Sequence, residues 1–378
     1  MNTYDFDRPV NRTGTNSIKW DLYQGRDIIP MWVADMDFQS PPEVLEALHR
    51  RIEHGVLGYT KTPETLNYAV KDHLQSHYGW AIDTEWLVWL PGLVVGLNLA
   101  CRSFAQGSEE VITFTPVYPP FLSAPRLSKR RLIRVPLGKQ DNHYTFDTDG
   151  FTQHLTPNTK LLLLCSPHNP VGRSFSAEEL LSIAETCVEH NIVICSDEIH
   201  CDLVLDAKRH VCTGSLSKAI EQQTVTLMSP SKTFNLPGLN CSFAVIPNET
   251  LRRRFQATGQ GIVPHCNALG YEAALAAYRH GESWRQVLLD TLRGNRDVIE
   301  DTINALPQLS MDHVEATYLA WINTENLQCT DPAHFFEQAG VGLSDGRQFD
   351  GQDHMRLNFG CTRPILMKAL DRIKDSVT

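Results

Sequence analysis

The stretch that decides the fold runs from residue 161 to residue 200 and reads LLLLCSPHNPVGRSFSAEELLSIAETCVEHNIVICSDEIH. It contains two short apolar runs, at 161–165 and 192–196, of the kind found in strands buried on both faces. Between them, Ser176 and Glu179 form a capping-box pattern, and apolar residues follow at helical spacing up to residue 188. Strand, helix and strand in this order predict neighbouring parallel strands with covered faces.

Similar runs extend this pattern in both directions along the chain. Further strands are predicted at 111–114, 225–228 and 243–246, helices at 268–278 and 283–306, and a second group of strands at 318–322 and 355–359. The first 45 residues read as an extended arm that leads into a helix near Pro41 and Pro42. We therefore predict an α/β fold with a mostly parallel central sheet flanked by helices and a smaller α+β domain. The predicted division is a large domain at 46–280 and a small domain at 1–45 plus 281–378.

Composition narrows the class of protein. The 378 residues are 42% hydrophobic and 21% charged, which excludes a disordered or coiled-coil chain. The net charge, 34 − 44 = −10, favours a small-molecule ligand over nucleic acid or an anionic membrane. No apolar run approaches the ~20 residues of a membrane span, and the N-terminus lacks the features of a signal peptide. The ten cysteines include no Cys-x-x-Cys pair, so we predict reduced thiols and a cytoplasmic location.

Three polar loops directly follow three of the predicted strands. They carry Asn169 after 161–165, Asp197 after 192–196 and Lys232 after 225–228. Ligands of open α/β sheets bind at the carboxyl ends of the strands, so these side chains are expected to meet. An amine, a carboxylate and an amide suit a pyridine-aldehyde cofactor, in which the lysine forms a Schiff base and the carboxylate pairs with the ring nitrogen. Taken singly, each residue is more often a surface lysine, a cap or a turn residue; only their joint placement argues for a site.

The loop motifs carry a family resemblance. They are Ser166–Arg173 (SPHNPVGR), Asp197–His200 (DEIH), Ser229–Gly238 (SPSKTFNLPG) and Arg356–Gly360 (RLNFG). In type and order this set resembles the fold-type I pyridoxal-phosphate (PLP) enzymes, the aminotransferase class I/II superfamily. Three further stretches resemble its MalY/PatB-type C–S β-lyases: Pro30–Phe38 (PMWVADMDF), Gly58–Thr60 (GYT) and Asn358–Cys361 (NFGC).

The resemblance implies a role for each matching residue around PLP. Lys232 holds the cofactor aldehyde and later moves protons, Asp197 keeps the pyridine nitrogen protonated, and Asn169 and His200 reach the ring 3′-oxygen. Tyr118 stacks on the ring, although it also reads as a core aromatic. The phosphate is held by the helix N-terminus at Gly92, Leu93 and Val94, by Ser229, and by Tyr59 of a neighbouring subunit. That last match implies a homodimer with shared active sites.

The resemblance also implies the substrate contacts and the reaction. Arg356 binds the α-carboxylate of an amino acid, a task that suits a guanidinium fork, and Ala34 and Asp35 edge the substrate pocket. The implied reaction is β-elimination from cystathionine or another cysteine S-conjugate, which yields a thiol, pyruvate and ammonia. Two alternatives stay open: an aminotransferase of the same fold, and a regulatory protein that keeps a PLP site but binds a transcription factor. The fifteen histidines form no metal-binding motif, so no metal is predicted.

Overall fold

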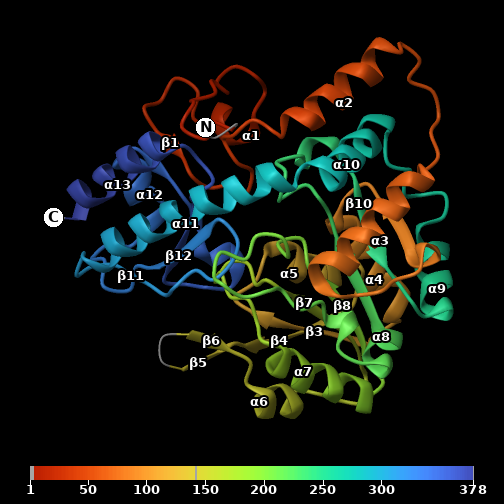
Figure 1. Cartoon of the computed structure of the whole chain (residues 1–378). Coiled ribbons are helices and arrows are strands. Elements are labelled where there is room, and N and C mark those ends of the chain that lie inside the picture. Colours follow the sequence, from red (N-terminus) through yellow and green to blue (C-terminus); the bar gives the residue numbers. More distant parts are fainter. Residues whose placement is uncertain (1–3, 141–142, 378) are drawn as a thin grey trace.

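The computed structural model describes residues 4–140 and 143–377 (Figure 1). Its centre is a seven-stranded sheet in the order β2-β10-β9-β8-β7-β3-β4. The strands are β2 (Leu87–Leu90), β3 (Glu110–Thr115), β4 (Arg131–Pro136), β7 (Thr159–Cys165), β8 (Val193–Asp197), β9 (Thr224–Met228) and β10 (Ser242–Val245). Strand β10 runs antiparallel to β2 and β9, and the other pairings in this sheet are parallel.

The strands predicted from apolar runs are present, with ends that differ by one or two residues. The sequence did not predict β4, because this edge strand carries two arginines and leaves its side chains largely half-buried or exposed. Nor did it indicate that β10 runs antiparallel to its neighbours, since a run of apolar residues does not show in which direction its strand pairs. The capping box of α7 (Ala177–Glu189) is confirmed: Glu179 N donates to Ser176 Oγ at 3.2 Å, and Ser176 N donates to Glu179 Oε2 at 2.8 Å.

Helices cover both faces of the central sheet. In β7, Leu161 and Leu163 face one layer and Leu162 and Leu164 the other, as the two-residue period of a strand requires. The first layer contains α4 (Leu93–Phe104), α5 (Pro119–Leu127) and α9 (Glu249–Gly259). The opposite face is covered by α3 (Glu64–Tyr78), α6 (Thr148–Gln153), α7, α8 (Lys218–Gln223) and α10 (Ala268–His280). Gly96 brings α4 close to the sheet, since a Cβ there would lie 2.9 Å from the Leu227 side chain.

A second unit is built on a four-stranded sheet in the order β11-β12-β15-β14. Its strands are β11 (Ser310–Met311), β12 (Leu319–Asn323), β14 (Ser344–Asp345) and β15 (His354–Asn358). The helices of this part of the chain are α11 (Glu282–Asn304), α12 (Pro332–Gln338) and α13 (Arg363–Val377). A small hairpin joins β5 (Gly138–Gln140) to β6 (His143–Thr145), and short 3-10 helices lie at Thr84–Trp86, Thr213–Ser215, Pro237–Leu239 and Gly346–Phe349.

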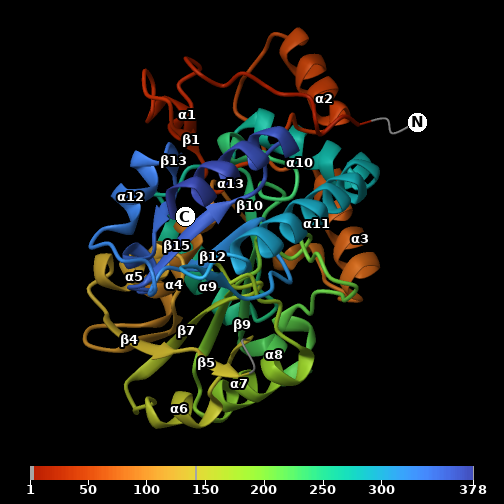
Figure 2. The same cartoon turned by 90° about the vertical axis from the view of Figure 1, so that its left-hand side faces the viewer.

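The N-terminal arm packs on the C-terminal unit. Strand β1 (Ile29–Pro30) pairs in parallel with β13 (Val341–Gly342), and both views place α1 (Ile18–Asp21) beside this region (Figures 1 and 2). Helix α2 (Pro42–Glu53) begins at the predicted Pro-Pro pair and packs against α10. The domain division at residues 46 and 280 stays a proposal. Within the part of the chain described, no helix has both the length and the apolar character that crossing a membrane needs.

Candidate active site

The site forms where β7, β8 and β9 end. These strands are parallel and in register, with Cys165 opposite Asp197 and Asp197 opposite Leu227. Their carboxyl ends therefore meet at one edge of the sheet, and the loops that follow bring Asn169, Asp197 and Lys232 together there. The charges of Asp197 and Lys232 act on each other across this edge, so the predicted convergence is present in the fold.

Lys232 is a half-buried lysine whose amine is held by a carbonyl group. Burial lowers the pKa of its ammonium group to about 8, and the charge of Arg356 acts in the same direction, while Asp35 and Asp197 oppose the shift. Its Nζ donates a hydrogen bond to the carbonyl oxygen of Ala34, which also accepts from the Tyr318 hydroxyl at 3.0 Å. A lysine that releases its proton this close to neutral pH suits a Schiff base and a general base.

Asp197 is a buried carboxylate with few partners. Burial raises its pKa to about 7, against the opposing effects of the Ile199 amide and the Lys232 charge. Its Oδ1 accepts a hydrogen bond from Ile199 N at 3.2 Å. A buried carboxylate is stabilised by a cationic N–H donor, which is what a protonated pyridine nitrogen provides. Asp197 therefore fits the ring nitrogen of PLP.

Asn169 and His200 present neutral polar groups beside Asp197. Asn169 Oδ1 accepts from Arg356 Nη1 at 3.0 Å, which leaves its amide NH2 group for another acceptor. His200 Nδ1 is buried and has no hydrogen-bond partner among the residues described. Burial lowers the pKa of His200 to about 3, so the ring is neutral at physiological pH. An unpartnered buried nitrogen calls for a ligand atom, and a ring oxygen fits this requirement.

Tyr118 precedes α5 and lies partly buried between the two core layers, with its backbone N–H donating to Asn169 O at 3.0 Å. The charges of Arg356 and Asp197 both act on its hydroxyl, which places the ring at the site. The ring of Tyr118 thus packs on the core while its hydroxyl lies near the charged groups, and its stacking on the cofactor ring stays a prediction.

An anion site is available at the start of α4. Gly92 is the N-cap, no side chain caps the helix, and a Cβ on Gly92 would meet no atom within 4 Å. The amides of Leu93 and Val94 begin the helix, where the dipole favours a phosphate. The Ser229 hydroxyl is already engaged, since its Oγ lies 2.9 Å from both Ser231 Oγ and Cys241 O. Ser231 is therefore a second hydroxyl in this turn, which sequence reasoning did not name.

Arg356 is a buried guanidinium on β15. Its Nη1 donates to Asn169, its Nη2 donates to Trp32 O at 2.8 Å and to Ser344 Oγ at 3.3 Å, and it lies over the Phe349 ring. Burial lowers its pKa to about 10, so it stays charged at neutral pH. Its Nε is buried without a partner, and no carboxylate pairs with it in the described residues. A carboxylate ligand would accept a hydrogen bond from the unpartnered Nε and would balance the positive charge of the guanidinium.

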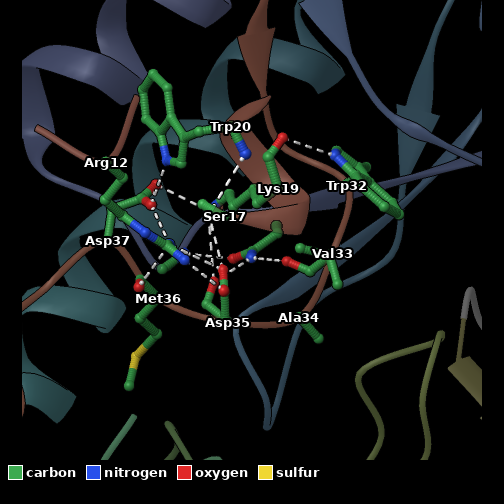
Figure 3. Close-up of polar contacts among 12 residues, drawn as sticks. Arg12, Ser17, Lys19, Trp20, Trp32, Val33, Ala34, Asp35, Met36 and Asp37 are labelled. Atoms are coloured by element: carbon green, nitrogen blue, oxygen red, sulfur yellow. Dashed lines mark hydrogen bonds and ion pairs between the residues drawn. The ribbon is translucent and has the colours of Figure 1, made fainter. Parts of the chain in front are cut away.

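The turn at 33–38 lies beside Lys232, and Figure 3 shows its polar contacts with the N-terminal arm. It contains Ala34 and Asp35, and together with Lys232 it lines a cavity of about 650 Å³. The Asp35 carboxylate is held by Arg12 at 2.6 and 3.0 Å, from the N-terminal arm. Sequence reasoning missed this arm contact. The signal was two acidic residues, Asp35 and Asp37, in an otherwise apolar stretch, since buried carboxylates require cationic partners.

The fold and the site together define a family. The chain matches the family model for aminotransferases of class I and II over residues 26–373, and it belongs to that family. It is 36% identical to cystathionine beta-lyase PatB of Bacillus subtilis (strain 168), over 99% of this chain and 100% of PatB. The family resemblance and the fold class predicted from the motifs are confirmed.

Two solved structures share the fold over almost the full length. OvoB, for which a crystal structure is known, shares 43% sequence identity with this chain. The two structures match with a TM-score of 0.97 over 99% of both chains. The structure of cystalysin from Treponema denticola, which contains a pyridoxal 5′-phosphate cofactor, is 31% identical. It has a TM-score of 0.95 and covers 99% of this chain and 98% of cystalysin.

Tyr59, by contrast, lies on the surface of the single chain. It is fully exposed on the connection between α2 and α3. Its neighbours Val56 and Leu57 are also exposed apolar residues. The predicted role of Tyr59 at the phosphate site of a neighbouring subunit stays a prediction.

Proposed function

We propose that this protein is a PLP-dependent C–S β-lyase that cleaves cysteine S-conjugates, with cystathionine as the principal candidate substrate. The observation that carries the proposal is the full-length similarity to the cystathionine beta-lyase PatB. The similarity spans the loops of Lys232 and Asp197 as well as the Pro30–Phe38 stretch beside them. The products would be a thiol, pyruvate and ammonia.

PLP fits the unsatisfied groups of the site. Lys232 would hold its aldehyde carbon, Asp197 its ring nitrogen, and the amides at the start of α4 its phosphate. The residues that complete the set are Asn169, His200, Tyr118, Ser229 and Ser231. When bound, PLP supplies an electron sink next to the Cα atom of the amino acid.

The protein's own residues orient the amino acid and move its proton. Arg356 binds the α-carboxylate and fixes the direction of the Cα–H bond. The neutral amine of Lys232 takes the Cα proton, which its lowered pKa permits. Loss of that proton supplies the electron pair that forms the Cα–Cβ double bond as the Cβ–S bond breaks and the sulfur leaves as a thiolate. Asp197, His200 and Arg356 are buried, which keeps their electrostatic interactions strong.

Incubation of the holoenzyme with L-cystathionine tests this function. We expect equimolar pyruvate, ammonia and homocysteine without any added 2-oxo acid. An enzyme that makes no pyruvate and transfers its amino group only when a 2-oxo acid is supplied would be an aminotransferase of the same fold and site. That result would contradict the lyase proposal while leaving the PLP site intact.

Arg356→Lys is expected to raise KM for cystathionine by roughly 10- to 100-fold, with a smaller effect on kcat. A lysine cannot pair with a carboxylate in a bidentate manner while also reaching Asn169 and the Trp32 carbonyl. Steady-state kinetics give both constants. The matched control is Arg347→Lys, since Arg347 is a half-exposed residue that pairs with Asp345. An unchanged KM for Arg356→Lys would remove Arg356 from the carboxylate site.

We also propose a homodimer in which Tyr59 reaches the phosphate site of the other subunit. The exposed apolar patch at Val56, Leu57 and Tyr59 supports this, because such side chains are usually covered in an assembly. A cytoplasmic location is supported by the cysteines, all ten of which are free thiols.

A further inference from the structure

A cluster of buried and partly buried charges joins the N-terminal arm to the turn at 33–38 (Figure 3). Lys19 is only 1% exposed, and its Nζ lies 2.8 Å from Asp37 Oδ2. Arg12 Nη1 donates to Asp37 Oδ1 at 2.7 Å, and the Arg12 guanidinium also binds both oxygens of Asp35. Trp20 Nε1 donates to Asp37 Oδ1 at 2.8 Å. Two cations and two carboxylates thus neutralise each other at one point.

This cluster fixes the arm firmly to the turn. Asp37 is 2% exposed, and removal of either cation would leave a buried carboxylate short of a partner. Ion pairs between exposed side chains contribute little, whereas a buried set of this kind strongly resists being separated. The arm is therefore a fixed part of the site, although it lies far from Lys232 in the sequence.

The same turn is tied to both halves of the active site. Asn235, three residues after Lys232, accepts from Met36 N at 3.0 Å and donates to Met36 O at 2.9 Å and to Phe38 O at 2.8 Å. Asn358, two residues after Arg356, donates to Asp35 O at 2.7 Å and to Val33 O. Between these anchors, the carbonyl of Ala34 accepts from the amine of Lys232.

We propose that Arg12 and Lys19 are positioning residues for Lys232. They hold Asp35 and Asp37, and so keep the Ala34 carbonyl at the place where the free amine rests between proton transfers. The arm also forms a wall of the 650 Å³ cavity that Lys232 lines, through Arg12, Asn16, Ser17 and Ile18. The proposal rests on the proposed function only in that Lys232 must exchange a proton with the substrate.

The test compares Arg12→Ala with Arg26→Ala in the holoenzyme. Arg26 lies in the same N-terminal region and pairs with Glu337 at 2.9 Å, but it is half-exposed and outside the cluster. We expect Arg12→Ala to lower kcat by roughly 10- to 100-fold with KM within about threefold, because a displaced base slows proton transfer while Arg356 still binds the carboxylate. Arg12→Lys keeps the charge and is expected to recover part of kcat. Arg26→Ala is expected to match the wild type.

A spectroscopic readout separates positioning from a general loss of structure. The groups that face Lys232 are Asp35, Asp197, Arg356 and His200, and Tyr318 shares its carbonyl acceptor. Loss of Arg12 leaves the Asp35 carboxylate without its guanidinium, and a nearby negative charge favours the protonated lysine. The pH titration of the cofactor absorbance, recorded without substrate, is therefore expected to move to higher pH in Arg12→Ala and to stay unchanged in Arg26→Ala.

Either of two results would overturn the proposal: an Arg12→Ala enzyme with wild-type kcat and titration, or an equal loss in Arg26→Ala. If Arg12→Ala does not fold, as judged by its melting curve, Trp20→Phe replaces it. That variant keeps every charge and removes one hydrogen bond to Asp37, and kcat is expected to fall about two- to fivefold; an unchanged kcat would overturn the proposal. Failure of the lyase proposal would show differently, because the wild-type enzyme would then make no pyruvate from cystathionine. In that case the rates of amino transfer by the Arg12→Ala and wild-type enzymes would still test the role of Arg12.

Discussion

Lys232→Ala is expected to lower pyruvate formation from cystathionine by about 10⁴-fold or more. The variant loses the amine that holds the cofactor and the base that takes the Cα proton, and no other amine is placed to replace it among the groups that act on Asp197. The burial that lowers the pKa of Lys232 to about 8 is what fits it for both tasks. A coupled pyruvate assay on purified protein, with PLP in excess, measures the loss.

The matched control is Lys218→Ala. Lys218 is an exposed lysine that pairs with Glu221 at 2.8 Å at the start of α8, away from the sheet edge that carries the site. Its replacement is expected to leave the rate unchanged. If Lys232→Ala kept more than a tenth of the wild-type rate, another residue would have to be the base. Partial recovery of the Lys232→Ala rate by added small primary amines would support the assigned role.

Asp197→Asn is expected to reduce the rate by roughly 10²- to 10³-fold while making the cofactor-free protein more stable at alkaline pH. The rate falls because an amide cannot supply the negative charge that keeps the pyridine nitrogen protonated. Stability rises because the carboxylate form of Asp197 is poorly solvated in the folded protein. The same substitution is thus expected to lower the catalytic rate and to raise the stability of the fold.

The sign of the stability effect follows from the pKa of Asp197. Burial raises the pKa from 3.8 to about 7 in the folded chain, so the folded state binds a proton that the unfolded state has released. The stability associated with that proton is fully present below pH 3.8 and is lost as the pH rises through about 7. The asparagine variant has no such dependence and is expected to be more stable at pH 8, by at most about 4 kcal/mol.

Urea unfolding of the cofactor-free protein at pH 5 and pH 8 measures this difference. The advantage of Asp197→Asn is expected to be larger at pH 8 than at pH 5. The control is Asp301→Asn, an exposed position on α11 where no pH-dependent advantage is expected. A variant whose advantage is the same at both pH values would show that Asp197 does not titrate in this range.

The parts of the site at strand ends could be predicted from the sequence, because short runs of neighbouring residues identify both the buried strands and the loops that follow them. Apolar runs mark the buried strands β7, β8 and β9, and parallel strands deliver the loops that follow them to one edge. The order of runs and loops along the chain is therefore enough to predict that Asn169, Asp197 and Lys232 converge. Arg356 came only through the family motif, since nothing local in a short strand indicates a buried guanidinium.

Asp35 and Asp37 signal a need for cationic partners, but the identity of those partners in the N-terminal arm could not be predicted, because the contacts join residues with no shared periodicity. Lys19 reads as a surface lysine, yet it is buried against Asp37. The hydrogen bond from the Ser229 hydroxyl could not be predicted either, since its acceptor, the carbonyl of Cys241, lies twelve residues further along the chain. Tyr59 lies exposed in a single chain, and the role proposed for it depends on a second subunit. These features are set by tertiary packing, on which sequence pattern carries no information.

Borohydride reduction of the wild-type holoenzyme, followed by proteolysis and mass spectrometry of the peptides, tests the central claim most directly. The reaction makes the bond between a lysine and the cofactor permanent, so the modified residue can be identified. We predict that the cofactor-derived mass lies on Lys232 and on no other lysine. A mass on a different lysine, or no modified peptide from protein reconstituted with PLP, would contradict the account.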